Sequence, residues 1–96
     1  MKVFKSYGFL IESMKYVVKI EVSLKHWYSD PEGETTARLL KELGYQVEKV
    51  DVSKVYTVIV TASSTAEAKV AAEEMCNRLL ANPTKDNCSI SVVVEQ

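Results

Sequence analysis

The chain has 96 residues, of which 47% are hydrophobic and 26% charged, and its formal net charge is −1. This is the composition of an ordinary soluble globular protein with one domain and one core. It argues against a nucleic-acid-binding protein, which usually carries a basic excess, and the sequence has no run of 18 apolar residues that could span a membrane.

The first 13 residues differ from the rest of the chain. Their longest apolar run, Phe9 to Ile11, is too short for the apolar region of a signal peptide, and no small-residue cleavage site follows it. A very regular strand pattern opens at Met14, and translation from that residue would already give a complete domain. We therefore predict an N-terminal extension over residues 1–13, either disordered or packed on a neighbouring subunit, and a single domain over residues 14–96.

A strand and then a helix are predicted in the first half of the domain. Residues 16–25 alternate between apolar and polar positions, which predicts a strand covered on one face. Asp30 is a good N-cap and Pro31 suits the first helical position, while Gly44 can adopt the left-handed conformation that ends a helix. The buried face of this helix is expected to consist of Thr36, Ala37, Leu39, Leu40 and Leu43.

Two further strands are predicted in the middle of the chain. Residues 46–52 (QVEKVDV) form the weaker one, with Val50 and Val52 on one face and Val47 out of phase. Residues 55–62 (VYTVIVTA) carry β-branched side chains on both faces, which is typical of a strand at the centre of a sheet.

The clearest helix follows these strands. Ser64 and Glu67 have the spacing of a capping box, and Pro83 ends the helix because the residue before a proline disfavours the helical conformation. A last strand is predicted over residues 88–95. The apolar stripe of the helix is expected to consist of Ala68, Ala71, Ala72, Met75, Cys76, Leu79 and Leu80.

The predicted order of elements is β-α-β-β-α-β. It indicates an α+β, ferredoxin-like, two-layer sandwich, in which two helices cover one face of a four-stranded antiparallel sheet. Right-handed crossovers would place the first and third strands at the centre. The face without helices would carry an apolar strip, which often marks an interface, so we predict dimerisation through this face or a sheet edge. The strip consists of Val17, Thr57, Ile59 and Val93.

No catalytic, cofactor-binding or metal-binding residues are predicted in this chain. Its three glycines are isolated, so there is no phosphate-binding loop. Cys76 and Cys88 are interpreted as free thiols, and the single His26 lies too far along the chain to complete a metal site with them. The aromatic residues Trp27 and Tyr28, beside His26, either dock a partner or cover the end of the sandwich.

The fold alone does not decide the function, because ferredoxin-like domains serve many. Residues 25–33 lack the arginine of an acylphosphatase and the Cys-x-x-Cys of a metallochaperone, and residues 55–62 lack the aromatic run of an RNA-recognition domain. A free-standing dimeric domain that binds a regulatory ligand remains as an alternative, and an independent enzyme is disfavoured.

Several motifs together resemble one family. Val22-Ser23-Leu24-Lys25 leads to Asp30-Pro31-Glu32-Gly33, and ARLLKELGY and EEMCNRLLANP follow. In this register, over roughly residues 15–95, the chain resembles PurS, the small subunit of phosphoribosylformylglycinamidine synthase. Residues 1–13, the bulky loop 26–29 and the pair Asn87-Cys88 depart from the family pattern.

The resemblance implies a non-catalytic accessory subunit in the cytoplasm, at least a homodimer, acting in de novo purine biosynthesis. It implies a large synthetase subunit (PurL) that holds ATP and Mg, a glutaminase subunit (PurQ) that releases ammonia, and a small subunit that bridges them and supports ammonia transfer. Capping and helix termination would explain Asp30, Pro31 and Pro83 equally well. The candidate partner-contact residues are Trp27, Tyr28, Asp30, Pro31, Gly33, Leu80, Asn82 and Pro83.

Overall fold

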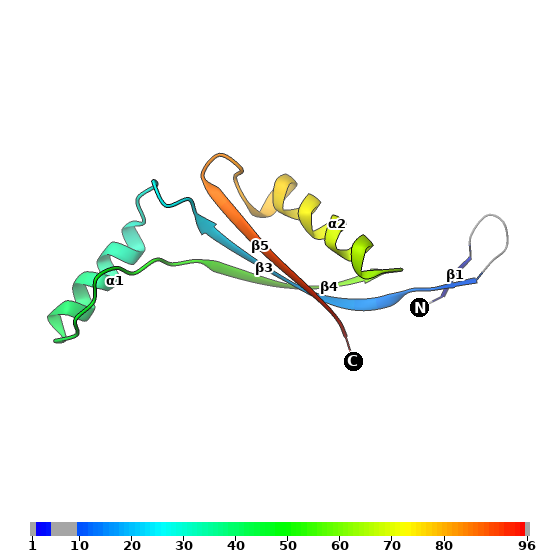
Figure 1. Cartoon of the computed structure of the whole chain (residues 1–96), viewed down its shortest axis with the longest axis horizontal. Coiled ribbons are helices and arrows are strands. Elements are labelled where there is room, and N and C mark those ends of the chain that lie inside the picture. Colours follow the sequence, from blue (N-terminus) through cyan, green and yellow to red (C-terminus); the bar gives the residue numbers. More distant parts are fainter. Residues whose placement is uncertain (1, 5–9, 96) are drawn as a thin grey trace.

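A computed structural model describes residues 2–4 and 10–95 of the chain. Strands β1 and β2 pair with each other in antiparallel orientation, apart from the main sheet. The predicted N-terminal extension includes residues 1 and 5–9, which lie outside the described residues, so its state stays a prediction. The elements in chain order (Figure 1) are β1 (Lys2–Phe4), β2 (Leu10–Glu12), β3 (Met14–Leu24), α1 (Pro31–Glu42), β4 (Lys54–Ala62), α2 (Thr65–Met75), the π-helical turn η1 (Cys76–Leu80) and β5 (Asp86–Val94).

The main sheet has three antiparallel strands in the order β4-β3-β5, and α2 packs on one face of it. Because strand side chains alternate between faces, every second residue of β3 from Tyr16 to Val22 points toward α2 and is buried. The facing residues of the helix are small, which lets its axis approach the sheet closely. This core confirms the α+β class and three of the predicted strands. Its helical side consists of Ala68, Ala72 and Cys76.

Helix α2 begins as the sequence predicts and ends differently. The Ser64 hydroxyl accepts a hydrogen bond from the Glu67 N–H at 3.1 Å, which is the capping contact. The last turn is π-helical, and the Ala81 N–H donates to the Cys76 carbonyl at 3.0 Å. A π turn holds more residues than an α turn. It therefore moves Leu79 off the apolar stripe on which it was predicted, and that side chain is 84% exposed.

The predicted strand over residues 46–52 pairs with no other strand of the described chain, so the sheet has three strands instead of four. A hairpin into β4 would need a tight turn at Ser53 and Lys54, and such turns favour positive φ angles. All described residues other than glycine have negative φ. The Val52 N–H instead donates to Asp30 at 2.8 Å, and the chain runs on into β4. Residues 55–62, the third predicted strand, were expected at the centre of the sheet. In the single chain they belong to β4, which lies at an edge, so that prediction is wrong for the single chain.

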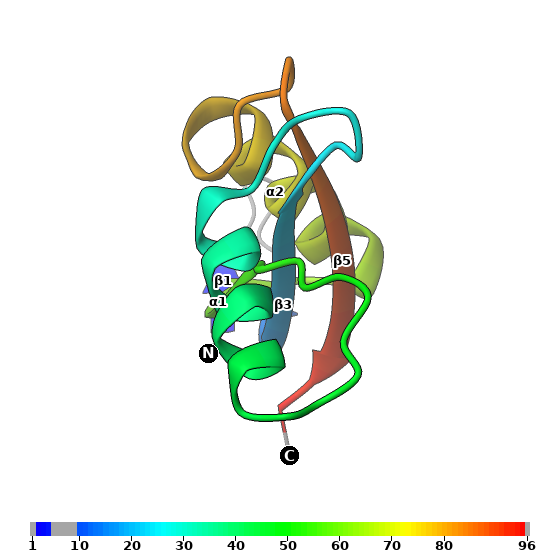
Figure 2. The same ribbon diagram turned by 90° about the vertical axis from the view of Figure 1, so that its left-hand side faces the viewer.

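Helix α1 does not cover the sheet, contrary to the prediction of two helices on one face. It belongs to an arm, residues 26–53, that stands away from β3, β4 and β5 (Figure 1). In the view along the long axis, the arm lies in front of the sheet (Figure 2). The hydrophobic core contains no residue of α1. The chain measures 65 × 30 × 14 Å and has a radius of gyration of 18.9 Å, whereas a compact domain of this length has about 12.5 Å.

Candidate functional site

The arm is closed at its base by the carboxylate of Asp30. Its Oδ1 accepts from the Gly33 N–H at 3.0 Å, which caps α1, and its Oδ2 accepts from the Val52 N–H at 2.8 Å. One side chain thus joins the start of the helix to the segment that returns to β4. The hydrogen bond from Gly33 and then that from Val52 lower the pKa of Asp30, because both stabilise the charged form.

Gly33 lets α1 and the returning segment approach each other. A Cβ atom at this position would lie 2.1 Å from the backbone oxygen of Val50, a distance at which the backbone has to move. Within the Asp-Pro-x-Gly motif, Asp30 caps, Pro31 occupies the first helical position, and Gly33 permits the approach. These three predicted contact residues therefore have a role inside the chain, and their contact with a partner stays a prediction.

The Asp30 contacts predict a pH dependence of stability. A carboxyl group whose pKa is lowered by folding stabilises the folded state above its unfolded pKa of about 3.9, and this contribution is lost as the pH falls through the folded value. The variant Asp30→Asn should therefore lie below the wild type in melting temperature at pH 6, and the difference should shrink below about pH 4. Thermal unfolding at several pH values measures this. A difference that stays constant down to pH 2 would contradict the role of the charge.

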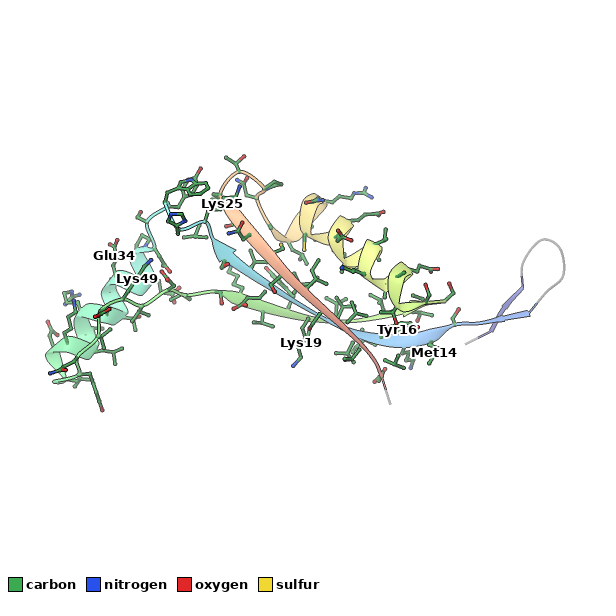
Figure 3. The ribbon with its side chains drawn as sticks, in the orientation of Figure 1. Met14, Tyr16, Lys19, Lys25, Glu34 and Lys49 are labelled. Atoms are coloured by element: carbon green, nitrogen blue, oxygen red, sulfur yellow. The ribbon has the colours of Figure 1, made fainter. Side chains whose placement is uncertain are left out.

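An aromatic cluster of His26, Trp27 and Tyr28 lies at the base of the arm, directly after Lys25, which is labelled in Figure 3. The rings of His26 and Trp27 are 5.2 Å apart in an edge-to-face arrangement, and the Lys25 Nζ lies 5.7 Å from the centre of the Trp27 ring. Trp27 is 67% exposed. This exposure favours the interpretation that the loop docks a partner over the interpretation that Trp27 covers the end of the sandwich. The sequence analysis missed the contribution of Lys25, which holds a cation over the ring.

A groove of about 780 Å³ runs between α1 and the returning segment. The candidates Trp27, Tyr28 and Asp30 line one end of it. Its charges come from both walls, such as Glu34 on α1 and Lys49 on the returning segment (Figure 3). The groove therefore combines an aromatic end with mixed charge, which suits a protein segment better than a single anion.

The predicted contact residue Leu80 lies near Asp30, although the two are 50 positions apart in the sequence. Leu80, at the end of η1, lines a cavity of about 270 Å³ together with Asp30. Asn82 and Pro83 do not line this cavity and are exposed. The Asn82 side-chain oxygen accepts from the Thr84 N–H at 3.0 Å, and the backbone N–H of Asn82 donates to the Asp86 carboxylate at 2.9 Å. Asn82 therefore shapes the turn before β5 and holds residues 82–86 in place.

The face of the sheet opposite α2 carries the predicted apolar strip. The strand register places Val17 directly between Ile59 and Val93, so the three side chains form one row across the sheet. Thr57 stands in the next row, opposite Lys19, which points away from α2 (Figure 3). Ile59 and Val93 are more than half exposed. The four predicted interface residues thus share one surface.

The described residues show no arrangement suited to catalysis. Both cysteines have free thiols, and burial, followed by the neighbouring Cys88 thiol, raises the pKa of Cys76 to about 11, so it is protonated at neutral pH. No group of three or more His, Cys, Asp or Glu side chains in the described part of the chain could hold a metal ion. None of the described helices has the length and apolar character needed to cross a membrane.

Comparison with known proteins identifies the family. Residues 17–94 match the family model PurS, described as phosphoribosylformylglycinamidine (FGAM) synthase. The phosphoribosylformylglycinamidine synthase subunit PurS of Archaeoglobus fulgidus is 40% identical over 75 residues, which are 77% of this chain and 94% of that protein. The crystal structure of Methanocaldococcus jannaschii PurS covers 84% of this chain and 99% of its own, with 33% identity and a TM-score of 0.78.

A structure of PurLQS from Thermotoga maritima contains a further similar chain. It is 27% identical, covers 86% of this chain and 100% of its own, and has a TM-score of 0.74. The matched regions behind these scores cover most of each chain. The extended shape of the arm is therefore compatible with the shapes of solved relatives. The family model, the relative and the structures agree, and this chain belongs to the PurS family.

Proposed function

We propose that this chain is the non-catalytic small subunit of phosphoribosylformylglycinamidine synthase, acting in de novo purine biosynthesis. The observation that carries this proposal is the family match over residues 17–94. The structure supports it in a second way, since the described chain offers exposed contact surfaces, with Trp27 67% exposed. The subunit would bridge the synthetase subunit PurL and the glutaminase subunit PurQ and would support the transfer of ammonia between them.

The chemistry of the complex would lie in the partner subunits, and the setting would be the cytoplasm. ATP and Mg are expected on the large synthetase subunit, as the resemblance to the PurS family implies. The groove of the arm, with Trp27 at its aromatic end, is the surface that we assign to a partner subunit. The row formed by Val17, Ile59 and Val93 is a second contact surface, for another copy of the chain.

The complete ferredoxin-like arrangement, with four strands and two helices on one face, belongs to the assembled protein in this proposal. The single chain supplies three paired strands and one covering helix. A fourth strand and a second covering helix would have to come from outside this sheet.

Trp27 tests the assignment of the groove. Because its ring is exposed, replacing it by alanine should change the melting temperature of the isolated chain by less than about 3 °C. A buried aromatic anchor at an interface contributes at least about 2 kcal/mol, so the variant should bind a mixture of PurL and PurQ at least about 30-fold more weakly. Co-elution on a sizing column at several concentrations measures this.

The variant Trp27→Phe is the matched control, since it keeps an aromatic face and should keep most of the binding. A sharp fall in the melting temperature of Trp27→Ala with unchanged co-elution would show that the residue stabilises the chain and does not contact a partner.

A further inference from the structure

Both cysteines of the chain lie in the interface between α2 and the sheet. Cys76 follows Ala68 and Ala72 at helical spacing, and all three side chains are buried against the sheet. Cys88 is the third residue of β5, and the alternation of that strand places its half-buried side chain on the same face as Ile90, which packs against this core. The thiol of the helix and the thiol of the strand therefore belong to the same layer of the core.

The course of the chain brings the two cysteines to the same end of this interface. Ala62, shortly before α2, pairs with Met14 at one end of β3, whereas β5 begins opposite Leu24 at the other end. Helix α2 runs from the first end toward the second (Figure 1), and Cys76 directly follows its last residue. Because Cys88 lies near the start of β5, both thiols lie at the Leu24 end.

The two thiols are close enough to interact. Next to burial, the Cys88 side chain is the largest cause that raises the pKa of Cys76, because it acts as a hydrogen-bond partner of that thiol. Cα atoms of α2 and β5 lie within 8 Å of each other, and a disulfide spans Cα atoms about 4.4–6.8 Å apart. Both thiols are free in this structure. A small approach of the helix end would therefore bring the two sulfurs into bonding distance.

The turn that begins at Cys76 can accommodate this approach. It is π-helical, and the Ala81 N–H closes it by donating to the Cys76 carbonyl at 3.0 Å. Such turns are rare and occur frequently at functional sites. Cys76 is the only buried residue of the turn, and Leu79 is 84% exposed. A shift of this turn therefore disturbs little of the core.

We propose that Cys76 and Cys88 form a redox-sensitive pair, which a low-molecular-weight disulfide such as oxidised glutathione converts to a disulfide. Cys88 reacts first, since it is half-buried while Cys76 is 3% exposed. Its thiolate attacks one sulfur of oxidised glutathione, and the first glutathione leaves as a thiolate. The Cys76 thiol then loses its proton, attacks the Cys88 sulfur and releases the second glutathione. The protein thus loses two hydrogens, and the glutathione disulfide is reduced to two thiols.

The disulfide would clamp residues 77–87, which connect the helix to β5. This segment carries the candidate contact residues Leu80, Asn82 and Pro83. Thiol buffers keep cytoplasmic cysteines reduced, so the clamp would close only when the oxidised form of such a buffer accumulates. This inference goes beyond the proposed accessory function, and its test requires neither PurL nor PurQ.

Oxidation of the folded full-length chain tests the pair. After incubation with oxidised glutathione without denaturant, the intact mass should fall by two hydrogens with no glutathione attached. Mapping of unreduced peptides should join the peptide of Cys76 to that of Cys88. The melting temperature should rise by about 5 °C or more, because the closed loop restricts the unfolded chain, and dithiothreitol should reverse the rise. The Ala81 amide should exchange its hydrogen at least about 10-fold more slowly in the oxidised form.

The matched control is Cys88→Ala, whose melting temperature should be the same with and without oxidised glutathione. If this variant does not fold, Cys88→Ser takes its place, because serine has nearly the size of cysteine. A wild type that keeps glutathione on Cys88, links two chains or leaves both thiols unreacted would overturn the pair. Equal exchange of the Ala81 amide in the reduced and oxidised forms would overturn the clamp.

Discussion

Replacing Gly33 by alanine is expected to open the base of the arm. The added Cβ would lie 2.1 Å from the backbone oxygen of Val50, so α1 and the returning segment have to separate. Overpacking of this kind typically costs about 1–3 kcal/mol. Because the hydrogen bond from Val52 to Asp30 depends on this approach, the Val52 amide should exchange its hydrogen faster. Urea unfolding and hydrogen exchange measure the two effects.

The control for this experiment is Thr35→Ala. Thr35 is exposed on the same helix, and alanine has the higher helix propensity, so stability should stay equal or rise slightly. If Gly33→Ala unfolds at the same urea concentration as this control and leaves the Val52 amide protected, the close approach does not hold the arm together.

Replacing Ile20 by alanine is expected to cause the largest loss of stability in the chain. Ile20 is fully buried at the centre of the sheet, directly between Tyr56 of β4 and Ile90 of β5. Removing three carbons from such a site costs about 2–5 kcal/mol, because the lost burial is combined with a cavity. Domains of this size have about 5–15 kcal/mol in total, so much of the stability should disappear.

Lys19→Ala provides the comparison on the opposite face of the same strand. Lys19 is exposed, and its replacement should change the free energy of unfolding by less than about 0.5 kcal/mol. Denaturant unfolding of both variants measures the difference. A cost below 1 kcal/mol for Ile20→Ala would show that α2 and the sheet do not form one cooperative core.

Local patterns predicted most elements of the fold because the physics behind them is local. Alternation revealed β3 and β5, β-branched side chains on both faces revealed β4, and the capping residues Ser64 and Asp30 mark helix starts in the structure. Gly44 has a φ of 99° after α1, as expected for a residue that ends a helix in the left-handed region. The π turn that exposes Leu79 gave no signal in the sequence, since its five residues are compatible with an α-helix.

The errors concern contacts between distant parts of the chain. The pattern of residues 46–52 predicts a strand, but a pattern does not specify which edge the strand pairs with. The central character of β4 predicts neighbours on both sides, while the single chain supplies one.

The candidate site was predicted in part for a similar reason. The sequence singled out Asp30 and Leu80, and the structure places both on one cavity. The motif around Asp30 did not reveal the bond to Val52, because the two residues are 22 positions apart. The sequence analysis also missed the groove beside Trp27. Its walls come from two segments, α1 and residues 48–51, and each of them alone reads as an ordinary charged surface.

The most direct test of the accessory role is glutamine-dependent turnover. Purified PurL and PurQ would be assayed for phosphoribosylformylglycinamidine formation with ATP, Mg and glutamine, with and without the full-length chain, and with ammonia replacing glutamine as the control. We predict that glutamine-dependent activity requires this chain, whereas ammonia-dependent activity of PurL changes little. Equal glutamine-dependent turnover in its absence would contradict the bridging role.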